Sequence, residues 1–116
     1  MQYSKSQVKK LNENFDRILL EVIDDSFVKI GGSMGPVIYY YLERKNFIQK
    51  KEIPKKTKQF SSCLKQIFGE RTEYFIKMFI VKKLYIEIEE SLEEIKNWSF
   101  TDYVKDARKK YVEKNR

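Results

Sequence analysis

Apolar residues recur every three or four positions along most of the chain, which is the spacing of one buried face of an α-helix. The first run contains a capping box, because Ser4 is followed three residues later by Gln7. Gly31 and Gly32 then allow the positive φ angles typical of a helix end. The pattern predicts a helix over about residues 5–29. Its apolar residues are Val8, Leu11, Phe15, Ile18, Leu19, Val22 and Ile23.

Capping residues also mark a second helix, which is expected over about residues 34–46. Ser33 suits the N-cap, and Pro36 lies in the first turn, where its missing N–H costs no hydrogen bond. We expect Phe47 and Ile48, which follow this helix, to pack back onto the core. The inward face of the helix is predicted to be Val37, Ile38, Tyr41 and Leu42.

Proline and glycine set the boundaries of the next segment. Residues 50–56 are interpreted as a linker, because Pro54 favours an extended conformation at Ile53. A third helix is predicted over about residues 57–68, with Gly69 as its end. Its apolar face consists of Phe60, Leu64, Ile67 and Phe68.

A fourth helix is predicted over about residues 70–89, and its apolar residues cover most of its circumference. Such a helix is either the central helix of a bundle or packs against a second copy of the chain. Residues 89–98 hold too few apolar side chains to distinguish a helix from an ordered loop. Ser99 then begins a C-terminal helix over about residues 100–113. The predicted fold class is all-α: one domain, residues 1–116, forming a compact bundle of four main helices plus the C-terminal helix.

The net charge of +7 is concentrated in the middle of the chain, since residues 36–69 hold eight basic and two acidic residues, a net charge of +6. A single cysteine, Cys63, excludes an internal disulfide and favours a reducing compartment, where we expect it to be a small core residue. The most apolar stretch, residues 74–88, is interrupted by lysines and glutamate and is too short to cross a bilayer. We therefore expect a cytoplasmic protein with no membrane partner.

Few residues are suited to catalysis. The chain has no histidine, which removes the usual general base near neutral pH and most zinc sites. The glycine-rich turn is not a phosphate-binding loop, because Pro36 and Val37 follow Gly35 where a lysine and a hydroxyl residue are needed. The acidic run Glu87, Glu89, Glu90, Glu93 and Glu94 is expected to be a solvated face. We predict a non-enzyme with no catalytic, cofactor-binding or metal-binding residues.

Three consecutive tyrosines, Tyr39, Tyr40 and Tyr41, point in different directions on one helix, so they cannot all enter one core. At least one of them is expected to be exposed or at an interface, where tyrosine is favoured. Tyr39 and Tyr40 are the candidate partner-binding residues.

Lysine residues of the basic middle third offer an alternative site, for nucleic acid. Phosphate groups attract such a surface without reading sequence. The long connection before the third helix and its few arginine or amide side chains argue against a helix-turn-helix motif. The candidate nucleic-acid-binding residues are Lys50, Lys51, Lys55, Lys56 and Lys58.

A family resemblance covers about half of the chain, from Gly31 to about Tyr85. The residues that carry it are Gly32-Ser33, Val37-Ile38-Tyr39-Tyr40-Tyr41-Leu42-Glu43, Glu52-Ile53-Pro54, Phe60, Leu64, Ile67-Phe68-Gly69 and Leu84-Tyr85. In these residues the chain resembles a small archaeal helical family, the Nitrosopumilus-type output domains. The resemblance implies an all-helical family-like core over residues 1–90, with residues 91–116 as a C-terminal extension. It also implies a role in archaeal signal transduction.

These observations favour a non-catalytic regulatory or adaptor module that acts through protein–protein contacts, alone or as a homodimer. The identity of its protein partner does not follow from the sequence. Nucleic-acid binding through the lysine-rich region 44–65 is the alternative.

Overall fold

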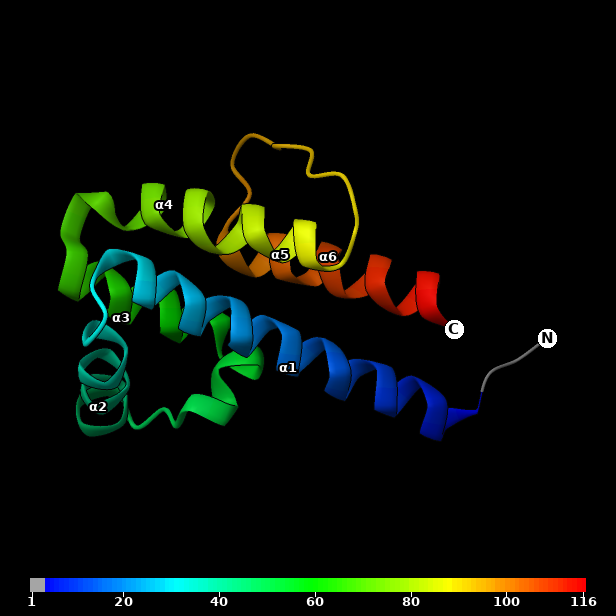
Figure 1. Ribbon diagram of the computed structural model, residues 1–116, viewed down its shortest axis with the longest axis horizontal. Coiled ribbons are helices and arrows are strands. Elements are labelled where there is room, and N and C mark those ends of the chain that lie inside the picture. The colour runs from blue at the N-terminus through cyan, green and yellow to red at the C-terminus, as the bar shows by residue number, and fades with distance from the viewer. Residues whose placement is uncertain (1–3) are drawn as a thin grey trace.

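Helix α1 (Lys5–Ile30) is the longest helix and runs through the middle of the bundle (Figure 1). Its 26 residues span about 39 Å at 1.5 Å per residue, close to the 46 Å longest dimension of the molecule. In this computed structural model, which describes residues 4–116, the capping box expected at its start is present. The Gln7 N–H donates to the Ser4 hydroxyl and the Ser4 N–H donates to the Gln7 side chain. The helix ends at Gly31, as the glycine pair predicts.

The described residues form an all-α bundle, which confirms the predicted fold class. Four predicted helices have the expected positions, with bounds within two residues of those predicted. The elements after α1 are α2 (Met34–Asn46), the 3₁₀ helix η1 (Lys50–Lys55), α3 (Thr57–Phe68), the 3₁₀ turn η2 (Gly69–Arg71), α4 (Thr72–Phe75), the π-helix η3 (Ile76–Val81), α5 (Lys82–Glu87) and α6 (Phe100–Asn115).

Two groups of elements lie on opposite sides of α1. In Figure 1, the continuous run from α4 through η3 to α5 follows the upper edge, with the loop after α5 above it, whereas α2 and η1 lie at the lower edge. Helix α6 packs against α1, α3 and η3 and so closes the bundle. The basic middle third of the chain, residues 36–69, therefore folds as neighbouring elements, α2, η1 and α3, which contact one another.

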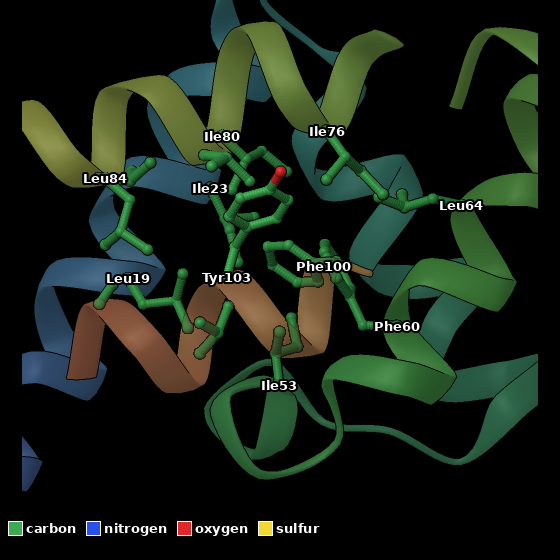
Figure 2. Packing of buried hydrophobic residues seen from close by; sticks show 14 of the residues in the cluster. Leu19, Ile23, Ile53, Phe60, Leu64, Ile76, Ile80, Leu84, Phe100 and Tyr103 are labelled. Carbon is green, nitrogen blue, oxygen red and sulfur yellow. The ribbon is translucent and has the colours of Figure 1, made fainter. Parts of the chain in front are cut away.

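The core is aromatic at its centre. The Phe27 ring of α1 stacks on Phe75 with centroids 5.9 Å apart and meets Tyr39 edge-on at 5.5 Å. Such pairs contribute about 0.5–1.5 kcal/mol beyond their burial. Figure 2 shows another part of the core, where aliphatic side chains of α1, η1, α3, η3 and α5 pack with rings of α3 and α6. The residues labelled there are Leu19, Ile23, Ile53, Phe60, Leu64, Ile76, Ile80, Leu84, Phe100 and Tyr103.

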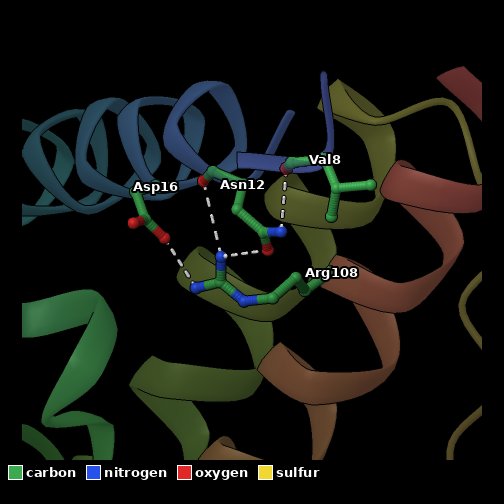
Figure 3. A network of polar contacts seen from close by, with 4 residues as sticks. All are labelled: Val8, Asn12, Asp16 and Arg108. Atoms are coloured by element: carbon green, nitrogen blue, oxygen red, sulfur yellow. Dashed lines mark hydrogen bonds and ion pairs between the residues drawn. The ribbon is translucent and has the colours of Figure 1, made fainter. Parts of the chain in front are cut away.

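Arg108 joins the two ends of the chain. Its guanidinium donates to the Asp16 carboxylate at 2.6 Å and to the Asn12 side chain at 3.0 Å, and it lies 4.6 Å from the centroid of the Phe15 ring (Figure 3). Asn12 is itself oriented by a hydrogen bond to the Val8 carbonyl. The guanidinium thereby fixes α6 against α1 by charge, hydrogen bonds and ring contact together.

Two expectations for α2 and its end are wrong. Val37, predicted to face inward, is 61% exposed, and Phe47, predicted to pack onto the core, is 82% exposed. Only Ile48 returns to the core, where it is 1% exposed. Phe47 takes a left-handed conformation (φ 55°), which turns the chain so that its neighbour points inward instead. Val37 precedes the buried Ile38 by one residue, about 100° around the helix, and so lies outside the buried face.

The segment expected to be a linker is the 3₁₀ helix η1. Ile53 is fully buried and helical rather than extended, and Pro54 is buried inside the element. Gln49 and Glu52 form a capping box at its start, in which the Gln49 N–H donates to the Glu52 carboxylate at 3.0 Å. Burial of an isoleucine contributes about 1.5–3 kcal/mol, more than the bias that proline imposes on the residue before it.

The predicted fourth helix is a continuous helical run, but its middle is the π-helix η3. Ser26 is fully buried, and its hydroxyl lies 2.7 Å from the carbonyl oxygen of Phe79 in the π-helix. The same hydroxyl lies 2.8 Å from the Val22 carbonyl, so its single proton serves two acceptors. Residues 89–98, left open between helix and loop, contain no helix.

Candidate protein-binding surface

The tyrosine triplet of α2 divides as its helical spacing predicts. Tyr40 is 63% exposed, whereas Tyr39 and Tyr41 are partly buried. The Tyr39 hydroxyl donates to the Asp24 carboxylate at 2.5 Å, and the Tyr41 hydroxyl makes a long 3.4 Å hydrogen bond to Gln66. The expectation that at least one tyrosine is exposed is confirmed by Tyr40. Of the two candidate partner-binding residues, Tyr39 has its polar group engaged inside the molecule.

Tyr40 belongs to an apolar stripe on the outer face of α2, which we call the α2 stripe and define as Val37, Tyr40 and Phe47. These side chains are 61, 63 and 82% exposed. Val37 and Tyr40 are three residues apart and so share one side of the helix, and Phe47 follows directly after the helix end. Arg44 lies between Tyr40 and Phe47 in the sequence, and its guanidinium is 5.4 Å from the centroid of the Tyr40 ring. The stripe therefore combines two aromatic side chains with a cation.

A hollow of about 780 Å³ adjoins the stripe between the end of α2 and η1. Both aromatic residues of the stripe contribute to its wall, together with side chains of either charge. The lining residues are Tyr40, Glu43, Arg44, Lys45, Phe47, Gln49 and Glu52. The hollow therefore offers both apolar contact and hydrogen-bonding groups.

The backbone of Phe47 is the least favourable feature of this surface. Its left-handed conformation places the N–H toward the Leu42 carbonyl and ends α2, which is a role that glycine normally fills. For a residue with a Cβ this conformation costs about 1–2 kcal/mol. Burial of the side chain offsets little of this cost, because the side chain is 82% exposed. Folding alone therefore does not account for phenylalanine at this position.

A group of three side chains holds this surface onto α1. Asp24 accepts hydrogen bonds from the Tyr39 hydroxyl and, at 2.7 Å, from the Lys50 ammonium, which lies 4.9 Å from the centroid of the Tyr39 ring. Burial, the hydrogen bond to Asp24 and the charge of Asp24 all raise the pKa of Tyr39 far above its ordinary value. The phenol therefore stays neutral and donates. The contact fixes α2 and η1 at a set position relative to α1.

Most cations of the basic third are exposed, but two of the five candidate nucleic-acid-binding lysines are engaged in ion pairs. Lys50 pairs with Asp24, and Lys56 pairs with Glu52 at 3.1 Å. Over residues 4–116, the remaining basic side chains of this third have no carboxylate within ion-pair distance. They are Arg44, Lys45, Lys51, Lys55, Lys58 and Lys65.

The acidic run does not gather into a metal site. Glu89 and Glu90 lie 3.8 and 3.6 Å from the Lys114 ammonium, and the other three carboxylates are exposed. Within the described part of the chain, no group of three or more potential ligands is close enough to hold a metal ion.

A second groove, of about 700 Å³, lies between α3, α4 and the residues before α6. Its lining includes Trp98 and Tyr103, whose rings meet edge-on at 5.2 Å, and lysine and glutamate side chains at the rim. Cys63 of α3 is 1% exposed, and burial raises the pKa of its thiol, which disfavours the reactive thiolate. Cys63 is a small core residue, as expected.

The run α4–η3–α5 is also less enclosed than its composition suggests. Tyr74 and Ile86 are 65% and 71% exposed, and Met78 is 38% exposed, so one side of the run faces solvent. The run is therefore not fully enclosed by its own chain. The buried side of the run contacts α1, α3 and α6.

Comparison of the chain with protein families, with curated proteins and with solved structures found no match. None of the helices over residues 4–116 is long and apolar enough to cross a bilayer.

Proposed function

We propose that the protein is a non-catalytic adaptor module that binds another protein through the α2 stripe and the adjoining hollow. The observation that carries this proposal is Phe47, which is 82% exposed and held in a left-handed conformation at the rim of the hollow. Strained backbone at an exposed aromatic residue is typical of a binding site, because the fold alone gains nothing from it.

The composition of the surface supports this function. Tyrosine and arginine are among the residue types that contribute most to protein–protein binding, and phenylalanine is enriched at the core of interfaces. Here Tyr40 and Arg44 of α2 and Phe47 directly after it line the same hollow. The contacts of Asp24 with Tyr39 and Lys50 hold the helix in place before a partner arrives, which lowers the entropic cost of binding.

The resemblance to archaeal output domains supports a more specific role. Output domains pass a signal to a partner, and a docking surface without catalytic residues fits this task. We propose that the protein acts in this way in the cytoplasm, as a regulatory module of signal transduction.

Site-specific photo-cross-linking tests the proposal. A photoreactive amino acid is placed at position 40 or 47 in cells that make the protein, and at position 13 as a control, because Glu13 is exposed on α1 far from the stripe. We expect protein adducts from positions 40 and 47 and few from position 13. Equal adduct formation at all three positions, or none at 40 and 47, contradicts the proposal.

Nucleic-acid binding is a second candidate, favoured by the six cations of α2, η1 and α3 that have no carboxylate of residues 4–116 within ion-pair distance. A mobility shift of a duplex or single strand that weakens steeply with salt supports it. Replacement of Lys51, Lys55 and Lys58 by glutamine then reduces the salt slope by about one unit per lost phosphate contact. Absence of binding at low salt excludes this candidate.

A further inference from the structure

The exposed residues of α3 are all polar. They recur three and four positions apart, opposite the buried Phe60 and Leu64, and so share the outer side of the helix. These residues are Lys58, Gln59, Ser62, Lys65 and Gln66. Residues 53–69, which include the whole of α3, hold four lysines and no carboxylate. The outer side of α3 therefore presents cations, amides and a hydroxyl.

Lysines of neighbouring elements extend this side at the start of α3. A hydrogen bond of 2.7 Å between the Thr57 and Thr101 hydroxyls joins the start of α3 to the start of α6. Lys105 is exposed one turn after Thr101 on the same side of α6, and Lys55 is exposed two residues before α3. We define the α3 surface as Lys55, Lys58, Gln59, Ser62, Lys65, Gln66 and Lys105.

One carboxylate borders this surface on the side of α6. Asp102 accepts hydrogen bonds from the Ser99 N–H and hydroxyl, which lower the pKa of Asp102. The charges of Lys105 and Lys58 lower the pKa of this carboxyl further, so both lysines lie near it. Asp102 therefore stays ionised and offsets one of the two lysines.

Two more carboxylates border the surface on the side of α4. Glu70 and Glu73 line the second groove, and so do Lys65 and Lys77. Arg71 of η2 is exposed next to them in the chain. None of these five side chains has an ion-pair partner among residues 4–116. The groove itself is therefore close to neutral.

The carboxylates of α2 and η1 do not offset the charge of the α3 surface. Glu52 is paired with Lys56 at 3.1 Å. Glu43 lies about 200° around α2 from Tyr41, whose hydroxyl reaches Gln66 of α3, and so faces away from α3. On and around α3, the cations without an ion pair in the described part of the chain are Lys55, Lys58, Lys65, Arg71, Lys77 and Lys105, and the carboxylates are Glu70, Glu73 and Asp102. With every carboxylate included, this region is basic.

Apolar side chains are absent from the surface, and this distinguishes between possible polyanionic partners. Among residues 4–116, the exposed large apolar side chains lie on α1, α2 and its end, the run α4–α5 and the loop after it, and none lies on η1, α3 or α6. Protein interfaces have apolar centres depleted in lysine, and membrane-bound helices insert apolar side chains. Single-stranded nucleic acid stacks on exposed aromatic rings. The backbone of a duplex is contacted by lysine, glutamine and serine side chains alone.

We infer that the outer side of α3 binds duplex DNA along its major groove. The inference rests on the second candidate function, nucleic-acid binding, and names the helix and the form of nucleic acid. The major groove of B-DNA is about 12 Å wide and admits an α-helix, whereas the deep, narrow major groove of duplex RNA does not. The lysines contact phosphates, which carry no sequence information, so binding tolerates many sequences.

Fluorescence anisotropy of a labelled 20-base-pair DNA duplex tests the inference, with the single strand and an RNA duplex of the same sequence as comparators. We expect the DNA duplex to bind most tightly at about 0.02 M salt. Four lysine–phosphate contacts predict a slope of log K against log salt concentration of about −3 to −4. Tighter binding of the single strand or of the RNA duplex overturns the inference.

A quadruple lysine variant tests the named surface. Lys55→Gln, Lys58→Gln, Lys65→Gln and Lys105→Gln together are expected to weaken duplex binding more than tenfold at low salt and to remove most of the salt slope. The matched control replaces four exposed lysines without ion pairs elsewhere, Lys10, Lys29, Lys82 and Lys96, by glutamine and changes the net charge equally. The control is expected to keep the salt slope. Equal losses in the two variants show that only the overall charge matters and overturn the inference.

A single substitution tests the centre of the surface. Ser62→Glu places a carboxylate between Lys58 and Lys65 and is expected to weaken duplex binding, whereas Ser91→Glu, in the exposed loop after α5, leaves it unchanged. Circular dichroism checks that each variant is folded. Equal binding by the two variants contradicts the role of α3.

The remaining outcomes separate this inference from the proposed functions. Duplex binding that persists in the quadruple variant places the DNA on another surface, so nucleic-acid binding stands and the role of α3 falls. Binding to phosphatidylserine vesicles without binding to DNA assigns the surface to a membrane instead. Absence of binding to any nucleic acid at low salt ends both the inference and the second candidate. The adaptor function is unaffected, because cross-linking from positions 40 and 47 tests it separately.

Discussion

Two groups of the same three residue types, tyrosine, aspartate and lysine, occur at opposite ends of the bundle. At one end, the Tyr85 hydroxyl donates to the Asp106 carboxylate at 2.6 Å, and the Lys110 ammonium lies 3.2 Å from the same carboxylate and 5.7 Å from the Tyr85 ring centroid. At the other end, Asp24 accepts from Tyr39 and from a lysine in the same arrangement. The two groups differ in depth.

Tyr85 is 1% exposed and its hydroxyl also lies 3.2 Å from the Tyr103 carbonyl, so this group joins α5 to α6 inside the core. Tyr39 is only partly buried and joins α2 and η1 to α1 beside the hollow. The comparison shows the same chemistry in two settings. The deep group lies in the core, whereas the shallow group holds against α1 the elements that carry the proposed binding surface.

Removal of the deep ring has the largest expected effect. Tyr85→Ala leaves a cavity in the core and is expected to lower the free energy of unfolding by about 3–5 kcal/mol, against about 1–2 kcal/mol for Tyr39→Ala, whose ring is partly exposed. Urea denaturation followed by circular dichroism measures both. Equal losses would show that depth does not separate the two groups.

Removal of the hydroxyl alone gives a smaller and more selective effect. Tyr85→Phe leaves Asp106 without its buried donor and is expected to cost about 1–3 kcal/mol. Tyr39→Phe costs about 1 kcal/mol or less, because water and Lys50 still solvate Asp24. The main expected effect of Tyr39→Phe is faster amide hydrogen exchange in η1. Unchanged exchange in η1 would contradict the positioning role of Tyr39.

Alkaline pH acts on both groups through the neutral phenols. Burial first, and then the hydrogen bond to and charge of the neighbouring aspartate, raise the pKa of Tyr39 and of Tyr85. Their stabilising contribution is complete below the unfolded pKa of about 10 and is lost as pH rises from there toward the folded pKa. The free energy of unfolding is therefore expected to fall above about pH 10, by up to about 1.4 kcal/mol per pH unit for each phenol.

The double variant Tyr39→Phe and Tyr85→Phe is the control for this pH dependence. Its free energy of unfolding, measured in urea at the same pH values, is expected to vary less steeply. A slope equal to that of the wild type would mean that other groups cause the alkaline loss.

The smallest predicted effect concerns the surface that the shallow group positions. Phe47→Gly relieves the left-handed strain and is expected to raise the free energy of unfolding by about 0.5 kcal/mol, after allowance for the greater chain entropy of glycine. The same variant is expected to lose cross-linking from position 40. Val37→Ala, on the same stripe but in regular helix, leaves stability within about 0.5 kcal/mol. Destabilisation by Phe47→Gly would show that the ring serves the fold.

Local signals in the sequence predicted most of the fold. Serine caps at Ser4 and Ser99 and glycine ends at Gly31 and Gly69 placed the helix boundaries, since these residues act on the backbone next to them. The 3₁₀ helix η1 was missed, because burial of Ile53 against α1 depends on residues far away in the chain. The π-helix was also missed. Apolar residues cover nearly the whole circumference of this helical run, so their spacing does not distinguish an α-helix from a π-helix.

The candidate site was predicted in part. The spacing of three tyrosines required an exposed one, and Tyr40 is exposed. The contact of Tyr39 with Asp24 was not foreseeable, since it depends on the angle between two helices. Phe47 was missed for a different reason: its apolar side chain suggested burial, and no residue type at this position signals a left-handed backbone. Its role as a binding residue stays a proposal.

The π-helix has a consequence for chain length. A π turn accommodates one residue more than an α-helix while the flanking turns keep their directions. Deletion of one residue near Lys77 or Met78, both exposed, therefore converts the turn to α-helix and leaves Phe75 before it and Leu84 after it facing their present neighbours. The same deletion in α5 turns every later side chain by about 100°. This helical run thus has one place where the protein can lose a residue and keep its core.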